Sequence, residues 1–173
     1  MGFATDEELL PVVDGDDRPV GLARRADIHA RGLSHRAAHV VLLDGAGRVY
    51  LQKRSQAKDT HPGLWTTSAS GHVDPGESYF AAAQRELMEE LGLALPLTAL
   101  GKVATGPATE NEFTFVYLAE SDCKPLPNPE EIERGEFFTW DAAWRLVRDP
   151  ERGCPCLAPV LRLVQRHLRL PVV

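Results

Sequence analysis

Residues 71–93 read Gly-His-Val-Asp-Pro-Gly-Glu-Ser-Tyr-Phe-Ala-Ala-Ala-Gln-Arg-Glu-Leu-Met-Glu-Glu-Leu-Gly-Leu, and this stretch decides the fold prediction. A helical pattern runs over Ser78–Leu91 after a loop that contains Pro and Gly. Gly92 is expected to end the helix, because glycine readily adopts the left-handed conformation of a helix C-cap. The sequence therefore predicts a loop, a helix and a second loop here.

Three glutamates of this predicted helix indicate a metal site. At about 100° per residue, Glu86, Glu89 and Glu90 lie on one helix face. Like charges at these spacings repel one another, so helix stability gives no reason for them. Mg²⁺ binds carboxylate oxygens and bridges to substrate phosphates, so we expect these glutamates to hold Mg²⁺, with Mn²⁺ as the alternative ion. The helix also carries a separate apolar stripe that is expected to face the core: Phe80, Leu87 and Leu91.

The spacing Gly-x5-Glu-x7-Arg-Glu-Leu-x-Glu-Glu-x-Gly-Leu over Gly71–Leu93 resembles the complete signature of the Nudix hydrolase family. The resemblance implies an α/β/α sandwich with a mixed β-sheet, in which a loop–helix–loop motif places the glutamates at a diphosphate. It further implies that Glu89 and Glu90 are metal ligands, and that Glu86 is either a ligand or the base that deprotonates water. The signature also implies an ion pair of Glu77 with Arg85. The positions that have a structural role in the signature are Gly71, Glu77, Arg85 and Gly92.

A second resemblance covers much of the chain outside this motif, from about Leu10 to Ala119. The segments Leu33–Ala37, Leu51–Lys58 and Gly63–Thr67 are similar to type I isopentenyl diphosphate isomerase. Cations that grip the diphosphate in that family match three positions: Arg25, Arg54 and Lys58. Ligands of a metal site in that family match five positions: His29, His35, His72, Glu110 and Glu112.

These matches leave two interpretations open. Imidazole and carboxylate together form a transition-metal ligand set, which would make a second divalent ion part of the site. Alternatively, the histidines are ordinary hydrogen-bonded residues, and Arg54 with Lys58 forms a solvated strand edge. We favour phosphate contact for these two cations, because guanidinium groups suit phosphate oxygens.

The isomerase resemblance breaks at Ser70. That family needs a cysteine there, opposite the glutamate that matches Glu112, and a hydroxyl is a far weaker acid than a thiol. Isomerases also degrade the glutamate motif that this chain keeps. We therefore predict metal-dependent hydrolysis of a phosphoanhydride bond in a small organic diphosphate, either a nucleoside di- or triphosphate or an isoprenoid diphosphate. The alternatives are isomerase-type proton transfer and a non-catalytic ligand-sensing Nudix module.

Composition and charge narrow the remaining function classes. The chain of 173 residues fits one domain, over 1–173. A net charge of −6 does not favour binding to a nucleic-acid polymer. The absence of an apolar run of about 18 residues argues against a membrane partner. Three cysteines are too few for a disulfide framework, so a reduced cytoplasmic enzyme is expected.

Turn residues and apolar patterning predict the elements around the motif. Strand patterns alternate with helix patterns, which is typical of a layered α/β domain. The Pro-rich segment 125–129 is expected to be a surface connection. The two predicted hairpins are Leu10–Val13 with Pro19–Ala23 and Ala38–Leu43 with Val49–Leu51. Two further strands are predicted at Glu112–Ala119 and Phe137–Thr139. Two further helices are predicted at Asp141–Val147, with Asp141 as the cap, and at Val160–Leu168.

Overall fold

The computed structural model describes residues 8–171 of the chain. None of the helices in that range is both long enough and apolar enough to cross a membrane. Its strands are β1 (Leu9–Val13), β2 (Pro19–Arg24), β3 (His35–Leu43), β4 (Val49–Arg54), β5 (Trp65–Thr66), β6 (Ala69–His72), β7 (Thr98–Lys102), β8 (Glu112–Glu120) and β9 (Ile132–Phe138). Its helices are α1 (Arg25–Arg31), α2 (Tyr79–Leu91), α3 (Trp140–Val147) and α4 (Leu157–His167), with a short 3₁₀ turn at Pro107–Thr109.

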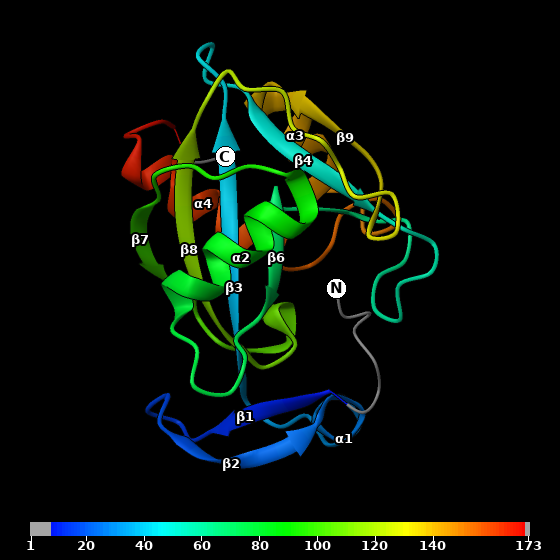
Figure 1. The fold of residues 1–173 in the computed structure, drawn as a ribbon. Helices are drawn as coiled ribbons and strands as arrows, with labels where there is room; N and C mark the ends of the chain where they lie inside the picture. The colour runs from blue at the N-terminus through cyan, green and yellow to red at the C-terminus, as the bar shows by residue number, and fades with distance from the viewer. Residues whose placement is uncertain (1–7, 172–173) are drawn as a thin grey trace.

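Strand β3 is the centre of the larger sheet. The strand order is β5-β4-β3-β8-β7, with β6 also paired to β3 and β9 to β4. β3 and β8 run parallel and the other pairs antiparallel, so the sheet is mixed. β1 and β2 form a separate two-stranded sheet, drawn in blue in Figure 1.

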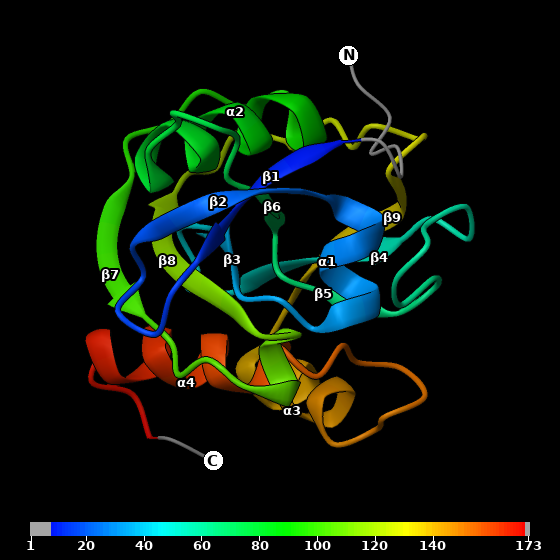
Figure 2. The ribbon, with the colours of Figure 1, turned by 90° about the horizontal axis from the view of Figure 1, so that it is seen from below.

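Helices cover both faces of the larger sheet. Figure 2 shows α2 on one side of the strands and α3 with α4 on the other. The alternation of side chains along a strand divides β3 between the two layers. Val40 and Leu42 pack in the cluster that contains α2, whereas Val41 and Leu43 pack in the cluster that contains α3 and α4. The predicted α/β/α sandwich is therefore confirmed.

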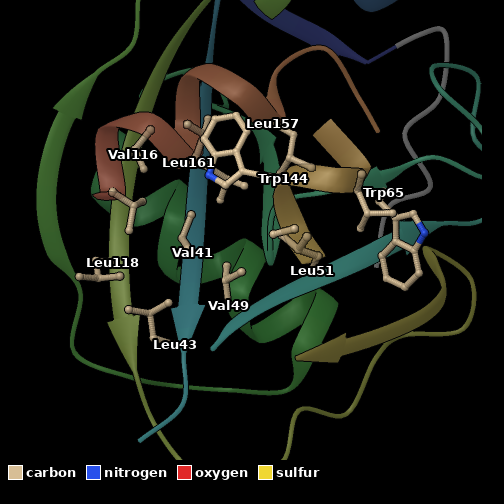
Figure 3. Packing of buried hydrophobic residues seen from close by; sticks show 14 of the residues in the cluster. Val41, Leu43, Val49, Leu51, Trp65, Val116, Leu118, Trp144, Leu157 and Leu161 are labelled. Carbon is tan, nitrogen blue, oxygen red and sulfur yellow. The ribbon is translucent and has the colours of Figure 1, made fainter. Parts of the chain in front are cut away.

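The core under α3 and α4 is purely structural. Trp144, Leu157 and Leu161 pack against Val41 of the sheet (Figure 3). Each fully buried aliphatic side chain of this kind contributes about 1.5–3 kcal/mol through removal of apolar surface from water. Trp65 also belongs to this core, with 2% of its surface exposed.

The boundaries of the central helix follow its sequence. The Ser78 hydroxyl caps α2 by accepting a hydrogen bond from the Ala81 N–H at 3.1 Å. Gly92 ends the helix with a φ of 65°, the left-handed conformation that glycine adopts without strain. The loop–helix–loop prediction is confirmed.

Three expectations need correction, and one helix was not predicted. Thr139, and not Asp141, caps α3, because its side chain accepts from the Ala142 N–H. Helix α4 begins at Leu157, three residues before the predicted start. The sequence pattern does not predict α1 as a helix. Phe80 is 44% exposed on the first turn of α2, so it does not belong to the buried stripe.

Candidate active site

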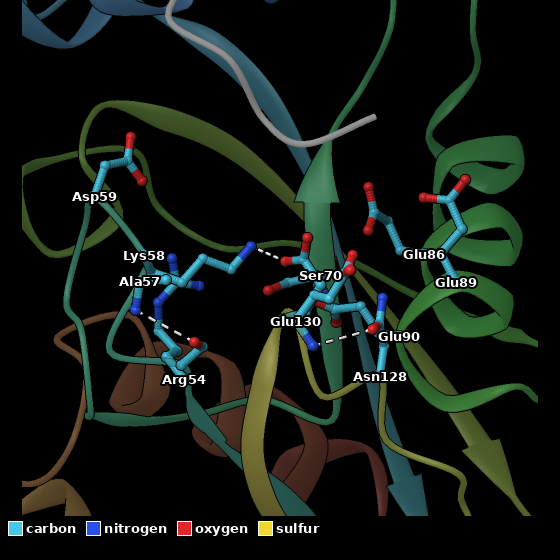
Figure 4. Close-up of polar contacts among 12 residues, drawn as sticks. Arg54, Ala57, Lys58, Asp59, Ser70, Glu86, Glu89, Glu90, Asn128 and Glu130 are labelled. Carbon is cyan, nitrogen blue, oxygen red and sulfur yellow. Dashed lines mark hydrogen bonds and ion pairs between the residues drawn. The ribbon is translucent and has the colours of Figure 1, made fainter. Parts of the chain in front are cut away.

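A cavity of about 930 Å³ lies beside α2, within the size range of small-molecule sites. Figure 4 shows the glutamates of α2 on one side of this region and Arg54 with Lys58 on the other. Segment 125–129, expected to be only a surface connection, reaches the wall through Asn128, whose N–H donates to the Glu90 carbonyl. The predicted ligands of metal and phosphate that line the cavity are Arg25, His29, Arg54, Lys58, His72, Glu86, Glu89, Glu90, Glu110 and Glu112.

Arg85 fixes the loop before α2 onto the helix. Its guanidinium donates to both carboxylate oxygens of Glu77 at 3.0 Å and to the His72 carbonyl at 2.9 Å. Glu77 in turn accepts the Asp74 N–H. The structure therefore brings together the Glu77–Arg85 pair that the Nudix resemblance implies, and this pair holds the loop in place.

The three glutamates of α2 differ in their surroundings. Glu90 is buried, and one of its oxygens accepts from Gln52 Nε2 at 2.7 Å and from the Ser70 N–H at 2.9 Å. The Glu86 carboxylate lies against Gly71, where any side chain would place a Cβ 1.9 Å from its oxygen. Glu89 is 54% exposed at the rim. Any side chain at position 71 would therefore displace the Glu86 carboxylate from its present place.

This carboxylate cluster carries charge that the protein compensates only in part. Burial and the neighbouring Glu90 raise the pKa of Glu86 to about 8, although Arg85 donates to Glu86 at 2.6 Å. Burial also raises the pKa of Glu90. Two neighbouring carboxylates with raised pKa values, one buried and one half-buried, favour a bound cation, and oxygen-only donors suit Mg²⁺ or Mn²⁺. The residues present therefore fit a hard divalent ion.

Three histidines meet on the other side of the cavity. Atoms of His29, His35 and His72 that can bind a metal all lie within 4.8 Å of one another. His35 Nδ1 lies 3.0 Å from the Leu33 carbonyl, which accepts its hydrogen, so Nε2 is the nitrogen that faces Glu112. Among the residues that the structure describes, Nε2 of His35 and Nε2 of His29 find no hydrogen-bond partner, and both atoms are buried. Unpaired buried imidazole nitrogens fit a transition-metal ion.

Glu112 faces this histidine cluster. One oxygen lies 3.6 Å from His35 Nε2 and 3.7 Å from His72 Nε2. Burial alone would raise the pKa of Glu112, but the two imidazoles hold it well below its usual range. Burial alone would likewise lower the pKa of His35, and Glu112 raises it instead.

Glu110 does not face the three histidines as a free ligand. Its carboxylate lies 2.7 Å from Nε2 of His61, a histidine without a predicted role in the site. This contact is the first cause of the lowered pKa of Glu110 and the raised pKa of His61. Of the five residues that match the isomerase metal site, the structure thus gathers four and pairs the fifth with a different partner.

Each predicted phosphate-binding cation has an acidic or polar partner that orients it. Arg25 is buried and donates to Asp59 at 2.9 Å. Arg54 donates to the Thr60 carbonyl at 2.9 Å, and Lys58 forms an ion pair with Glu131. These cations point into the same cavity as the glutamates of α2.

Two polar residues join the site without being predicted from the sequence. His39 lies in an apolar stretch of β3, but it shares the face of His35 because side chains alternate along a strand. That period-2 spacing of two histidines is the signal that identifies it. Gln52 follows an apolar run in β4, and nothing in its local pattern indicates a contact with Glu90.

Comparison with known proteins identifies relatives of this chain. Residues 33–162 match the family model of the NUDIX domain. The chain is 36% identical to an isopentenyl-diphosphate Delta-isomerase of Serratia proteamaculans over 84% of this chain and 85% of that protein. It is 35% identical to an uncharacterized Nudix hydrolase of Pseudomonas aeruginosa over 92% of this chain and 95% of that protein.

A solved structure shares the fold. The crystal structure of DR0079 from Deinococcus radiodurans aligns with a TM-score of 0.76 and 30% sequence identity. The alignment covers 85% of this chain and 93% of that one.

Proposed function

The chain belongs to the Nudix family, and from this premise we propose that it hydrolyses a phosphoanhydride bond in a small organic diphosphate with a divalent metal ion. The observation that carries the proposal is the carboxylate cluster of α2. Glu90 is buried and Glu86 is half-buried, and both have raised pKa values, which favours a cation between the protein and a phosphate.

The residues divide the work by their positions. Arg25, Arg54 and Lys58 bind and orient the diphosphate, because their charges face the cavity. The raised pKa of Glu86 suits it to accept a proton from the attacking water. When bound, a divalent ion would neutralise charge on the carboxylates and on the diphosphate.

Isomerisation is the second candidate, since relatives such as the Serratia protein are named isopentenyl-diphosphate isomerases. The histidine cluster and Glu112 also favour it. Ser70 argues against it: the residue lies opposite His39 in the β3–β6 pair and presents a hydroxyl where the isomerase resemblance requires a thiol.

A release assay tests the proposal. Pure protein with Mg²⁺ or Mn²⁺ is incubated with nucleoside di- and triphosphates and with isoprenoid diphosphates, and free phosphate and pyrophosphate are measured. We expect metal-dependent release from at least one substrate and no conversion of isopentenyl diphosphate, followed by carbon and phosphorus NMR. Dimethylallyl diphosphate formed at an enzymatic rate, without phosphate release from any substrate, would show that the chain is an isomerase.

A further inference from the structure

The first two strands and the first helix form a unit beside the larger sheet, here called the N-terminal unit (Leu9–Arg31). Strands β1 and β2 form their own sheet, and Figures 1 and 2 show the hairpin turn and α1 at opposite ends of the unit. Its buried apolar residues Leu10, Val13 and Ile28 belong to neither of the two core clusters found among the described residues. The two hydrophobic cores therefore do not by themselves fix the place of this unit.

The N-terminal unit supplies part of the wall of the main cavity. Arg25 and His29 of α1 both line it, and Arg25 is a cation that we assign to the diphosphate. The contact of Arg25 with Asp59 is an ion pair whose carboxylate is 47% exposed. Ion pairs that water can reach are weak. The position of Arg25 therefore depends on how firmly the rest of the unit is held.

Asp17, in the turn between β1 and β2, connects the unit to three elements outside it. Its carboxylate accepts from Arg36 Nε at 2.6 Å and from the Tyr79 hydroxyl at 2.9 Å, and it forms an ion pair with Lys102. These partners belong to β3, to the first turn of α2 and to the end of β7. The Asp17 side chain is only 7% exposed, so water competes little with these contacts.

The charge of Asp17 is central to this contact. Burial alone would raise the pKa of Asp17, but hydrogen bonds from Lys102, Arg36 and Tyr79 hold it below its usual value. Arg36 and Lys102 also lie over the Tyr79 ring, 5.4 Å and 5.3 Å from its centroid. Without the carboxylate, two cations would share one ring with no anion between them. The attachment of the turn should therefore weaken when Asp17 loses its charge.

The turn itself does not need the side chain of Asp17. The Asp14 carboxylate accepts the N–H groups of Asp16 and Arg18, both at 2.9 Å, and so closes the turn locally. Asp17 has a φ of 63°, in the left-handed region that Asp and Asn adopt more readily than most other residues with a side chain. An asparagine at this position should thus free the turn from its partners without unfolding it.

We propose that Asp17 is a positioning residue that holds α1 where Arg25 and His29 complete the cavity, by joining the hairpin turn to Arg36, Tyr79 and Lys102. Strand β2 has six residues, about 20 Å of extended chain, and α1 follows it directly. Because β2 is paired with β1, a shift of the turn reaches α1 through a stiff connection. This inference rests on the proposed function, which assigns Arg25 to the diphosphate.

Amide hydrogen exchange of the whole protein without ligand tests the position of the unit. Asp17→Asn removes the charge, and Tyr79→Phe removes one hydroxyl group. We expect exchange in β2 and α1 to become at least threefold faster in Asp17→Asn and to change in the same direction in Tyr79→Phe, with α3 and α4 unchanged. Asp16→Asn is the matched control, because Asp16 is the neighbouring residue and forms an exposed ion pair with Arg18.

Unchanged exchange of α1 in Asp17→Asn would overturn the inference. An equal increase in α3 and α4 would also overturn it, because the variant would then loosen the whole fold. This measurement needs no ligand, so it decides the question even if the probe described next does not bind.

Binding of a diphosphate probe tests what the position of α1 does for the site. The probe is methylenediphosphonate with Mg²⁺, which is not hydrolysed, and calorimetry gives its affinity. We expect Asp17→Asn to weaken binding about fivefold and Arg25→Ala about tenfold, while the double variant binds no more weakly than Arg25→Ala, because residues that act through one another are not additive. Asp17→Asn should instead multiply the loss caused by Arg54→Ala. Losses that multiply equally in both double variants would overturn the inference.

The outcomes separate this inference from the proposed function. With a substrate found in the release assay, KM of Asp17→Asn should rise about fivefold while kcat changes less. Phosphate release with KM unchanged in this variant would support hydrolysis and overturn the positioning role. Conversely, faster exchange of α1 and the non-additive loss of probe binding, without phosphate release from any substrate, would support the positioning role and refute hydrolysis.

Discussion

Two acidic regions of one cavity behave in opposite ways. Glu86 and Glu90 on α2 have raised pKa values, and Glu112 at the start of β8 has a lowered one. All three carboxylates are largely removed from water, so burial acts on each in the same direction. The groups beside each carboxylate therefore decide whether its pKa is raised or lowered.

Glu112 faces two imidazoles that favour its charged form, whereas Glu86 has the charge of Glu90 beside it as well as the Arg85 guanidinium, and its pKa stays raised. The closest partners of Glu90 are neutral, the Gln52 amide and the Ser70 N–H. The protein thus stabilises the charge of Glu112 by itself and compensates the charges of the α2 region only in part. From this comparison we infer that the α2 region serves catalysis, while Glu112 also contributes to the stability of the fold.

The largest expected effect is on turnover. Glu90→Gln should lower kcat at least a hundredfold, about 3 kcal/mol in the barrier, because a ligand carboxylate is lost. Its unfolding free energy should hold or rise, since repulsion with Glu86 falls. Steady-state kinetics at saturating Mg²⁺ and thermal melts measure both, with the exposed Glu120→Gln as control. Near-wild-type turnover would remove Glu90 from the metal site.

Glu112→Gln should lower the unfolding free energy, the opposite of the effect expected for Glu90→Gln. Neutralising this carboxylate leaves His35 and His72 without their charged partner, at a cost of about 2–3 kcal/mol in unfolding free energy. Urea melts of this variant and of Glu90→Gln, both without metal, give the direct comparison. Equal stability of the two variants would show that the two regions do not differ in the way their pKa shifts indicate.

The cations on the opposite wall extend the comparison. Arg54 contributes to the field at Glu90 and faces the predicted diphosphate position. Arg54→Ala should raise KM about tenfold, roughly 1–2 kcal/mol, with a smaller change in kcat. Lys53→Ala is the matched control, because Lys53 is the preceding residue and pairs with Glu133 instead. Unchanged KM in Arg54→Ala would return Arg54 to the solvated-edge interpretation.

The two regions also differ in how well the sequence predicts them. The α2 region depends on local rules: the cap at Ser78, the stop at Gly92 and three glutamates on one helix face. These determinants lie within one short segment, so spacing alone predicts their arrangement. The histidine cluster gathers residues from three elements, and only the family resemblance, not spacing, indicated that they meet.

The helix bounds and contacts that the sequence did not predict have physical causes. Helix α1, which carries Arg25 and His29, has seven residues and no side-chain cap, so its sequence gives little helical signal. Pro159 lies inside the first turn of α4, where proline needs no N–H partner, so it does not mark the helix start. The contact of Glu110 with His61 depends on two distant loops and has no sequence signature.

The smallest expected effect is a pH dependence that isolates the α2 region. The pKa of Glu86 is about 8 in the folded protein and near its ordinary value in the unfolded chain. Between those values the unfolded chain has released a proton that the folded protein keeps, so stability falls as pH rises. The lowered pKa of Glu112 affects stability in a different pH range. The stabilisation of the fold by charged Glu112 is complete above the ordinary pKa of a glutamate and is lost only as pH falls below that value.

Melting temperatures in EDTA from pH 7 to pH 8 test this sign. Histidines titrate in the same window, so the informative quantity is the difference between wild type and Glu86→Gln. The melting temperature of wild type should fall relative to that of Glu86→Gln by about 2–4 °C, roughly 1 kcal/mol, as pH rises. Added Mg²⁺ should abolish it, because a bound cation favours the ionised carboxylates. Parallel curves in EDTA would mean that the α2 carboxylates are as well compensated by the protein as Glu112, and the comparison between the two regions would fail.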